Sequence, residues 1–284
     1  MTHGALPSRP GYPCPMSARR SRPRTGPPTG SVPADSGTAS FDAVPGDPHA
    51  YVLTLNDVPA SPYHAADPRV LGFEYLRWIA HLVSVAYADH RTLRAVHIGG
   101  AACALPRHIE AMRPGSRQTV VEIDAALAAW VRDHLDLPRS PALAIRTADG
   151  AQEIHRFRPG TIDLMVRDAF AFDTTPSALT TADWFDAACA ALAPHGVYVS
   201  NVADGQDRRA LRTEVDALRS RFAHVVALVE PTQFRRRRRG NIVVAAAHRA
   251  LDADRLARAL RKDGASVRTG EGLLSHLGPS GGRR

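Results

Sequence analysis

The stretch that decides the fold reads Ala95-Val-His-Ile-Gly-Gly-Ala-Ala-Cys-Ala104, and it is followed by a second run, Thr119-Val-Val-Glu-Ile-Asp124. Each run begins with apolar, β-branched residues and ends in residues suited to a turn into a helix. Gly99 and Gly100 carry no Cβ, so the backbone there can approach a ligand closely, and the helix that follows offers free N–H groups. A tight strand-to-helix turn without any ligand would explain the glycines equally well.

The same alternation of strands and helices continues along the chain. We predict strands at 93–98, 118–123, 142–147, 161–167 and 196–202, with helices at 104–113, 125–135, 150–157, 180–192 and 207–221. Such alternation indicates parallel strands joined by right-handed crossovers. The last two strands, His224-Val-Val-Ala-Leu-Val-Glu and Asn241-Ile-Val-Val-Ala-Ala-Ala, have no predicted helix between them, so they should pair antiparallel.

The predicted fold class is therefore α/β. It is a doubly wound, mostly parallel seven-stranded sheet with its last strand antiparallel, the Rossmann-like layout associated with class I methyltransferases. We expect one such domain over residues 90–250. A C-terminal helix and a loose basic tail should occupy residues 251–284.

Two further regions are expected ahead of this domain. Residues 1–48 are rich in Pro, Gly, Ser and Arg and lack apolar periodicity, so we expect a disordered tail. Residues 49–89 should form a small β-hairpin and then an amphipathic helix. For this helix we predict Asp67 as the N-cap residue, with Pro68 in the first turn.

Composition excludes several classes of protein. The 284 residues, 44% of them hydrophobic, can form a sizeable core, but they contain no apolar run long enough to span a membrane. The three cysteines are too few and too scattered for a disulfide framework, which favours the cytoplasm. The histidines show no metal-ligand spacing, so we expect no metal.

The formal net charge of +8 raises the question of nucleic acid. Much of the excess lies in the N-terminal arginines, in the run from Arg235 to Arg239, and in the tail. Because aromatic interleaving and a recognisable nucleic-acid module are absent, we interpret the run as a solvated loop and expect no nucleic-acid partner. A homo-oligomer is left open.

Acidic residues stand just after three predicted strands, where ligands bind in open α/β sheets, and Ser200-Asn-Val-Ala-Asp204 could add polar wall residues after another. Glu122 could accept two hydrogen bonds from a ribose diol, whereas Asp124 is better suited to cap the following helix. Asp149 could receive an adenine amine, with Gly150 allowing the ring to lie against the backbone, although Asp149 could equally cap a helix. Asp168 could hold a substrate ammonium and take its proton, or could be a structural acid.

Taken together, the motifs resemble the spermidine synthase family over about residues 50–248. The resemblance rests on Ile98-Gly-Gly, Val121-Glu-Ile-Asp, Ala148-Asp-Gly, Ile162-Asp-Leu-Met-Val-Arg-Asp-Ala-Phe, Leu179-Thr-Thr-Ala-Asp-Trp-Phe, Leu192-Ala-Pro-His-Gly-Val and Arg239-Gly-Asn-Ile-Val-Val. It implies an aminopropyltransferase of polyamine biosynthesis that uses decarboxylated S-adenosylmethionine and a small-molecule amine. By resemblance, Gly99, Gly100, Glu122, Asp149 and Gly150 would bind this co-substrate, and Asp168 would be catalytic.

Two acids that are usual in the family are replaced in this chain. Ala102 stands where the glycine loop usually has an acid, and Asp168 is followed by Ala-Phe-Ala-Phe, so that no acid lies three residues on. An S-adenosylmethionine-dependent methyltransferase acting on another small substrate is the alternative prediction. Three acids at the mouth of the pocket would favour a polyamine acceptor, whereas an aromatic mouth formed by Phe170 and Phe172 would favour another substrate.

Overall fold

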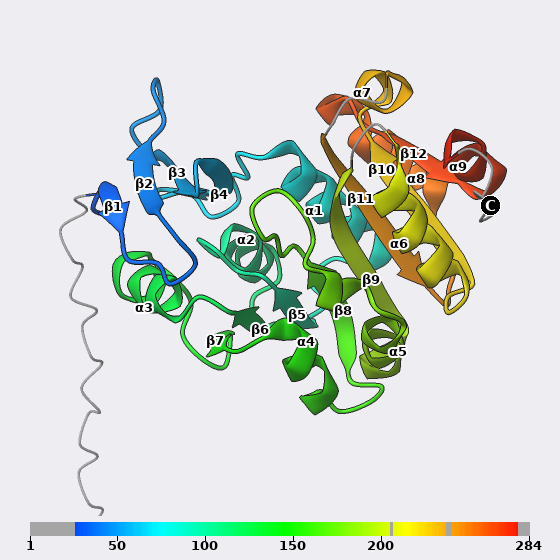
Figure 1. The fold of residues 1–284 in the computed structure, drawn as a ribbon, viewed down its shortest axis with the longest axis horizontal. Coiled ribbons are helices and arrows are strands. Elements are labelled where there is room, and N and C mark those ends of the chain that lie inside the picture. Colours follow the sequence, from blue (N-terminus) through cyan, green and yellow to red (C-terminus); the bar gives the residue numbers. More distant parts are fainter. Residues whose placement is uncertain (1–25, 205–206, 237–239, 278–284) are drawn as a thin grey trace, which may run out of the picture.

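The computed structural model describes residues 26–204, 207–236 and 240–277, and this part of the chain contains two β-sheets (Figure 1). The larger sheet has eight strands in the order β12-β10-β11-β9-β8-β5-β6-β7. Its strands are β5 (Arg94–Ile98), β6 (Arg117–Glu122), β7 (Leu143–Thr147), β8 (Ile162–Arg167), β9 (Leu192–Asp204), β10 (His224–Val229), β11 (Gly240–Ala247) and β12 (Ser266–Thr269).

The predicted fold class is confirmed. The strands β7, β6, β5, β8 and β9 are parallel to one another. The strand β11 lies between β9 and β10 and is antiparallel to both. The sheet differs from the prediction by an eighth strand, β12, which pairs antiparallel with β10. After α8 (Ala253–Leu260) the chain turns back at Gly264, which has a positive φ of 67°. Four half-buried or exposed residues of mixed polarity then form β12, too short a strand for a periodic signal.

Helices cover both faces of the large sheet (Figure 1). The helices are α1 (Glu74–Ala86), α2 (Ala104–Met112), α3 (Ala125–His134), α4 (Gly150–Glu153), α5 (Ala182–Ala191), α6 (Arg209–Arg219), α7 (Pro231–Arg235), α8 (Ala253–Leu260) and α9 (Gly270–Leu277), with short 3₁₀ turns η1 (Ile154–Arg156), η2 (Ser177–Thr180) and η3 (Arg261–Asp263).

Alternation along the strands divides the core into two halves. In β8, for example, Leu164 and Val166 pack in the cluster with α1, α2 and α8, whereas Met165 packs on the opposite face with α5 and α6. Successive side chains of a strand point to opposite faces, so a strand covered on both faces is apolar throughout. Both faces of this sheet are therefore buried. A ligand can bind at the rim formed by the carboxyl ends of the parallel strands.

The smaller sheet corrects the expected N-terminal tail. It consists of β1 (Gly30–Val32), β2 (Ala39–Ala43), β3 (Ala50–Leu55) and β4 (Val58–His64), all antiparallel. The hairpin predicted after residue 49 is present as β3 and β4, but residues 30–43 add two strands to it. The expectation of a loose tail up to residue 48 is therefore wrong for these residues, and residues 1–25 lie outside the described part.

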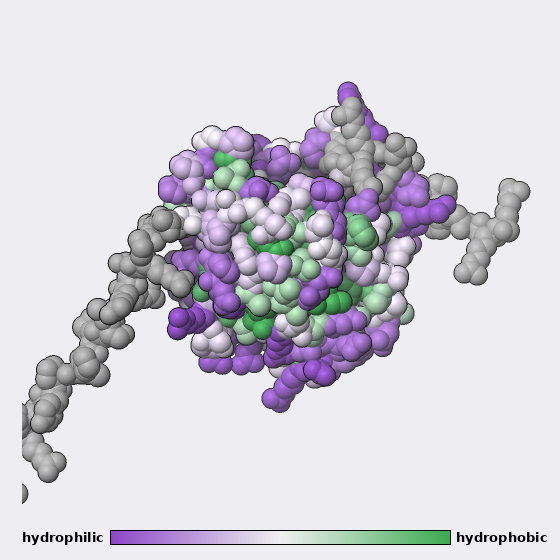
Figure 2. Space-filling view, turned by 60° about the vertical axis from the view of Figure 1, so that its left-hand side comes forward, coloured by the Kyte–Doolittle hydropathy of each residue, from purple (hydrophilic) through white to green (hydrophobic). Residues whose placement is uncertain are grey.

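Aromatic packing explains why β2 is ordered. The Phe41 side chain is fully buried, stacks on Tyr51 at 5.3 Å between ring centroids, and lies 5.4 Å from the ring of Trp130 in α3. Burial of one such aromatic ring contributes on the order of 2–3 kcal/mol, enough to order a short strand within a polar segment. Seen from the side of the N-terminal sheet, the molecule has a central hydrophobic area within a largely hydrophilic rim (Figure 2).

The helix predicted near Asp67 begins later than expected, at Glu74. Asp67 instead accepts hydrogen bonds from the backbone N–H and the guanidinium of Arg69, and these bonds lower the pKa of its carboxyl group to about 2. The chain between Asp67 and α1 is held by Arg77, which donates to the carbonyl oxygens of Leu71 and Gly72. A local turn thus takes the residue that sequence reasoning assigned as a cap.

The connection between β10 and β11 also differs from the prediction. It contains the short helix α7, whereas no helix was expected there. The two strands pair antiparallel as predicted, with His224 opposite Ala247. Of the arginine run, residues 237–239 lie outside the described part, as do residues 278–284 of the predicted basic tail. Among the described helices, none combines the length and the apolar character that a membrane span requires.

Candidate active site

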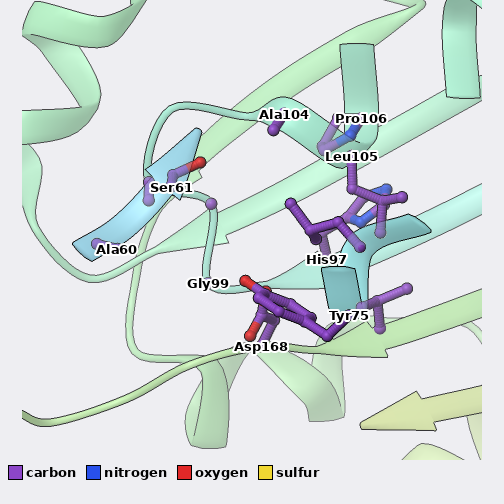
Figure 3. Close-up of a pocket in the computed structure, with 13 residues that line it drawn as sticks. Ala60, Ser61, Tyr75, His97, Gly99, Ala104, Leu105, Pro106 and Asp168 are labelled. Carbon is purple, nitrogen blue, oxygen red and sulfur yellow. The ribbon is translucent and has the colours of Figure 1, made fainter. Parts of the chain in front are cut away.

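A pocket lies at the carboxyl ends of β5 and β8, against β4, α1 and the start of α2 (Figure 3). It encloses about 390 Å³ of empty space, its open mouth included. In Figure 3, the Tyr75 ring lies beside Asp168, and Leu105 and Pro106 lie toward the other end. The lining residues are Ala60, Ser61, Tyr75, Leu76, His97, Gly99, Gly100, Ala101, Ala104, Leu105, Pro106, Val166 and Asp168.

The glycine loop that follows β5 forms one wall of this pocket. Gly99 has a positive φ of 87°, and a Cβ atom on it would come within 2.3 Å of the Asp168 carbonyl oxygen. A Cβ atom on Gly100 would come within 2.3 Å of the Val120 side chain. The chain thus needs both glycines to bring the loop against β8 and β6. Both line the pocket, so the tight turn and the predicted ligand loop coincide.

Glu122, predicted to bind a ribose, lies at the end of β6 and holds the glycine loop. Its Oε2 atom accepts hydrogen bonds from the N–H groups of Gly100 at 2.9 Å and Ala101 at 3.1 Å. Its Oε1 atom accepts one from the N–H of Asp124 at 3.2 Å. A carboxylate has about four acceptor positions, so this arrangement leaves capacity for a diol. The ribose role stays a prediction.

Asp124 caps α3, the role for which the sequence favoured it. Its Oδ1 atom accepts a hydrogen bond from the N–H of Leu127 at 2.8 Å. The same carboxylate accepts hydrogen bonds from the N–H groups of Asp35 and Ser36, in the turn between β1 and β2. Burial raises the pKa of Asp124, but these hydrogen bonds outweigh burial and lower the pKa overall. The smaller sheet is thereby tied to the edge of the large one.

Asp149 and Gly150, the predicted adenine residues, follow β7. The Asp149 carboxylate caps α4 by accepting from the N–H of Ala151 at 2.8 Å. Gly150 packs so closely on β5 that a Cβ atom would lie 2.6 Å from the Ile98 side chain. Neither residue lines the pocket beside Asp168. The structure thus brings Gly99, Gly100 and Asp168 together and places the other three predicted residues along the same edge of the sheet.

Asp168 is held by two side chains from distant parts of the chain. The Tyr75 hydroxyl donates to its Oδ2 atom at 2.9 Å, and the Asn201 amide donates to its Oδ1 atom at 3.0 Å. Removal from solvent raises the pKa of the Asp168 carboxyl group, although both hydrogen bonds and the nearby Arg167 oppose this rise. Burial also raises the pKa of Tyr75, so its hydroxyl stays protonated and remains a donor.

Sequence reasoning missed Tyr75 as a site residue and named Asn201 only within a weak polar segment. Tyr75 is the second residue of α1 and lies on its buried side, so periodicity alone shows it as a packing residue. Asn201 lies in β9 beside β8, and its Oδ1 atom is buried without a hydrogen-bond partner. A polar residue within an apolar strand was the available signal for Asn201, and no local signal exists for Tyr75.

His97 is a buried histidine that also lines the pocket. Its Nε2 atom lies 3.1 Å from the Oε1 atom of Gln118, whose Nε2 atom donates to the Pro106 carbonyl oxygen at 2.8 Å. This orientation of the amide assigns the imidazole proton to Nε2. Burial lowers the pKa of His97 to about 4, so the ring is neutral near pH 7. Within the described residues, no group of three or more His, Cys, Asp or Glu side chains could hold a metal ion.

The loop after Asp168 supplies neither the additional acids nor the aromatic mouth by which the sequence analysis distinguished acceptor classes. Phe170 is half-buried, Phe172 is 71% exposed, and neither lines the pocket. Asp168 is the only carboxylate among the lining residues that the structure describes. The pocket therefore has neither three converging acids nor an aromatic mouth, and its walls are mostly aliphatic.

The strand order and the polar carboxyl edge define a class of protein, the α/β proteins with the sheet topology of class I methyltransferases. No family model matches the chain. A polyamine aminopropyltransferase of Chromobacterium violaceum is 32% identical over 121 residues, which are 42% of this chain and 45% of that protein. The matched region thus spans about half the length of this relative.

Solved structures cover much more of the chain. A probable spermidine synthase from Corynebacterium glutamicum is 31% identical, with a TM-score of 0.83 over 90% of this chain and 96% of that one. A spermidine synthase in complex with the transition-state analogue AdoDATO is 16% identical, with a TM-score of 0.62 over 88% of this chain and 84% of that one, a similarity of fold. The chain belongs to the spermidine synthase family.

Proposed function

We propose that the protein is a transferase that moves an aminopropyl group from decarboxylated S-adenosylmethionine to a small-molecule amine. The observation that carries this proposal is the Asp168 carboxylate, held by Tyr75 and Asn201 beside the glycine loop. The polyamine aminopropyltransferase and spermidine synthase names of its relatives support the same reaction class.

The donor would lie along the carboxyl edge of the parallel strands. In this proposal Glu122 binds the ribose, Asp149 and Gly150 contact the adenine, and the loop at Gly99 and Gly100 borders the sulfonium end. Glu122 keeps free acceptor positions and Asp149 is only half-buried, so both carboxylates can take further hydrogen bonds. When bound, the donor supplies a carbon activated by its positively charged sulfur.

Asp168 acts on the acceptor amine in this mechanism. An ammonium group donates a proton to the carboxylate, which frees the nitrogen lone pair to attack the activated carbon. A nitrogen–carbon bond forms, the carbon–sulfur bond breaks, and its electron pair stays on sulfur, so a neutral thioether leaves. The raised pKa of Asp168 brings it nearer to working pH and makes it a better proton acceptor. Tyr75 and Asn201 fix its orientation, so that much of the rate comes from positioning.

The charges around the pocket favour the decarboxylated donor over intact S-adenosylmethionine. No Lys or Arg side chain is among its lining residues in the described part of the chain, and His97 is neutral. A donor carboxylate placed here would face Asp168 without a cation to pair with, which is unfavourable in a partly dry site. This is also the argument against the methyltransferase alternative.

Calorimetry with the decarboxylated and the intact donor tests the proposal, followed by detection of 5′-methylthioadenosine and of the alkylated amine in the presence of several amines, putrescine among them. We expect tighter binding of the decarboxylated donor and product formation that Asp168→Asn abolishes while donor binding persists. Donor binding without transfer to any amine would refute the transferase function. Failure of both donors to bind would refute the nucleoside site itself.

We further propose that residues 90–250 carry the donor site and that the reaction takes place in the cytoplasm. The location follows from the sparse cysteines, of which Cys103 and Cys189 are unpaired. Burial raises the pKa of the Cys103 thiol to about 12, so this residue beside the glycine loop acts in packing and not as a nucleophile.

A further inference from the structure

We propose that the acceptor of this enzyme is an amine with one positive charge and an apolar body, a primary alkylamine in chemical class, and not a diamine. The inference rests on the proposed function, because it takes the pocket beside Asp168 as the acceptor site. It concerns which amine the pocket can hold, a question that the family membership of the chain leaves open.

The lining of the pocket offers a place for one ammonium group. Asp168 supplies the single negative charge, and the Tyr75 hydroxyl and the neutral His97 ring add polar atoms without charge. Ser61 is the remaining polar side chain. The other side chains are aliphatic or absent, and they belong to Ala60, Leu76, Gly99, Gly100, Ala101, Ala104, Leu105, Pro106 and Val166.

The other acids along the carboxyl ends of the strands do not add a second negative charge to the pocket. Glu122 holds the glycine loop, and Asp149 caps α4 on the far side of β6. Glu74 and Asp173 are both exposed and do not line the pocket. The segments outside the described residues, which are 1–25, 205–206, 237–239 and 278–284, contain no Asp or Glu at all.

Ala102, the position in the glycine loop where the family usually has an acid, does not line the pocket. Ala102 is fully buried in the cluster formed by the smaller sheet and α3, together with Phe41 and Trp130. Tight aromatic packing on this side leaves no room for a carboxylate that could reach the acceptor. The loss of an acid at Ala102 is thus built into the packing of the N-terminal sheet.

A diamine bound to Asp168 would therefore place its second ammonium beside aliphatic side chains, with no second carboxylate among the lining residues. Removing one member of a buried charge pair typically costs affinity by a factor of 30 or more, on the order of 2–5 kcal/mol. An alkyl chain, in contrast, would lie against Leu76, Leu105 and Val166 and gain from leaving water.

The test compares two amines that differ by one charge. The full chain is first titrated with 5′-methylthioadenosine, which checks the nucleoside site separately, and is then saturated with it. 1-Aminobutane and 1,4-diaminobutane are next titrated by calorimetry. We expect 1-aminobutane to bind at least tenfold more tightly. From 1-aminopropane to 1-aminopentane, affinity should rise roughly fourfold for each methylene.

Ala60 offers a matched pair of variants, because it lies on β4, is half-buried and lines the pocket. Ala60→Asp adds a second carboxylate and should raise the affinity for 1,4-diaminobutane at least tenfold. Ala60→Asn has nearly the same shape without the charge and should leave the preference unchanged. Unaltered affinity for 5′-methylthioadenosine shows that each variant is folded.

The outcomes separate the inference from the proposed function. If the nucleoside fails to bind, the proposed function falls and the inference falls with it. If the nucleoside binds and 1,4-diaminobutane binds as tightly as 1-aminobutane or more tightly, the inference alone is overturned. Binding of the nucleoside with no binding of either amine at millimolar concentration also overturns it.

Discussion

Acid should destabilise this protein through His97, and the size of the effect follows from its burial. The side chain is 2% exposed and its pKa is lowered to about 4 by burial, whereas an unfolded histidine titrates near 6.5. The unfolded chain therefore binds a proton at a pH where the folded chain does not. Stability that is present above pH 6.5 is lost as the pH falls toward 4.

The expected loss is about 2 kcal/mol between pH 7 and pH 5, and it approaches about 3 kcal/mol near pH 4, since one pKa unit corresponds to roughly 1.4 kcal/mol. His97→Gln keeps a donor toward Gln118 and cannot be protonated. The free energy of unfolding of the wild type minus that of the variant should therefore decrease as the pH is lowered from 7 to 4.

Urea unfolding followed by tryptophan fluorescence at pH 7, 6, 5 and 4.5 measures this difference. His224→Gln, at an exposed histidine of β10, is the matched control and should follow the wild-type curve. Parallel curves for wild type and His97→Gln would refute the reasoning, as would an imidazole that titrates near 6.5 by NMR. The second result would also give the pocket a positive charge below about pH 6.5, which would alter the charge count on which the acceptor class depends.

Three further predictions concern contacts that hold the fold together. Glu214→Gln should lower the free energy of unfolding by roughly 3–5 kcal/mol, because it leaves the fully buried Arg167 without its ion pair at 2.7 Å; chemical denaturation checks this. Phe41→Ala should cost about 3–5 kcal/mol in the same assay, and no cost would mean that β2 is a loose tail after all. Asp263→Asn removes the ion pairs that hold Arg77 and His81 of α1, the helix that carries Tyr75. The kcat for aminopropyl transfer should therefore fall about tenfold with KM nearly unchanged, and this effect should vanish in a Tyr75→Phe background.

The large sheet was predictable because its strands are buried on both faces and separated by regular helices. Strand directions followed from connection lengths, including the antiparallel pair β10 and β11. The strands that sequence analysis missed, β1, β2 and β12, have three to five residues each and lie within polar or turn-rich segments. Their order depends on tertiary contacts, such as the rings around Phe41, which leave no periodic signal.

The edge residues were predictable for a different reason. Parallel strands end on the same side of a sheet, so residues that follow each strand must lie near one another. This places Gly99, Glu122, Asp149 and Asp168 along one edge without any knowledge of their contacts. It does not say which of them share a pocket, because that depends on what covers the edge. In this protein residues of α1 and β4 line a pocket together with Gly99 and Asp168.

The contacts of Asp168 therefore change the picture of how the chain is divided. Sequence reasoning separated a hairpin and helix over residues 49–89 from the α/β domain over 90–250. Tyr75, which lies 93 positions before Asp168, donates to its carboxylate, and Ala60 and Ser61 line the same pocket. A boundary at residue 90 would thus divide the pocket, because Asp168 lies after it and Tyr75, whose hydroxyl donates a hydrogen bond to Asp168, lies before it. The α/β domain supplies the carboxyl ends of the strands, but the pocket beside Asp168 forms where β4 and α1 of the N-terminal region pack against them.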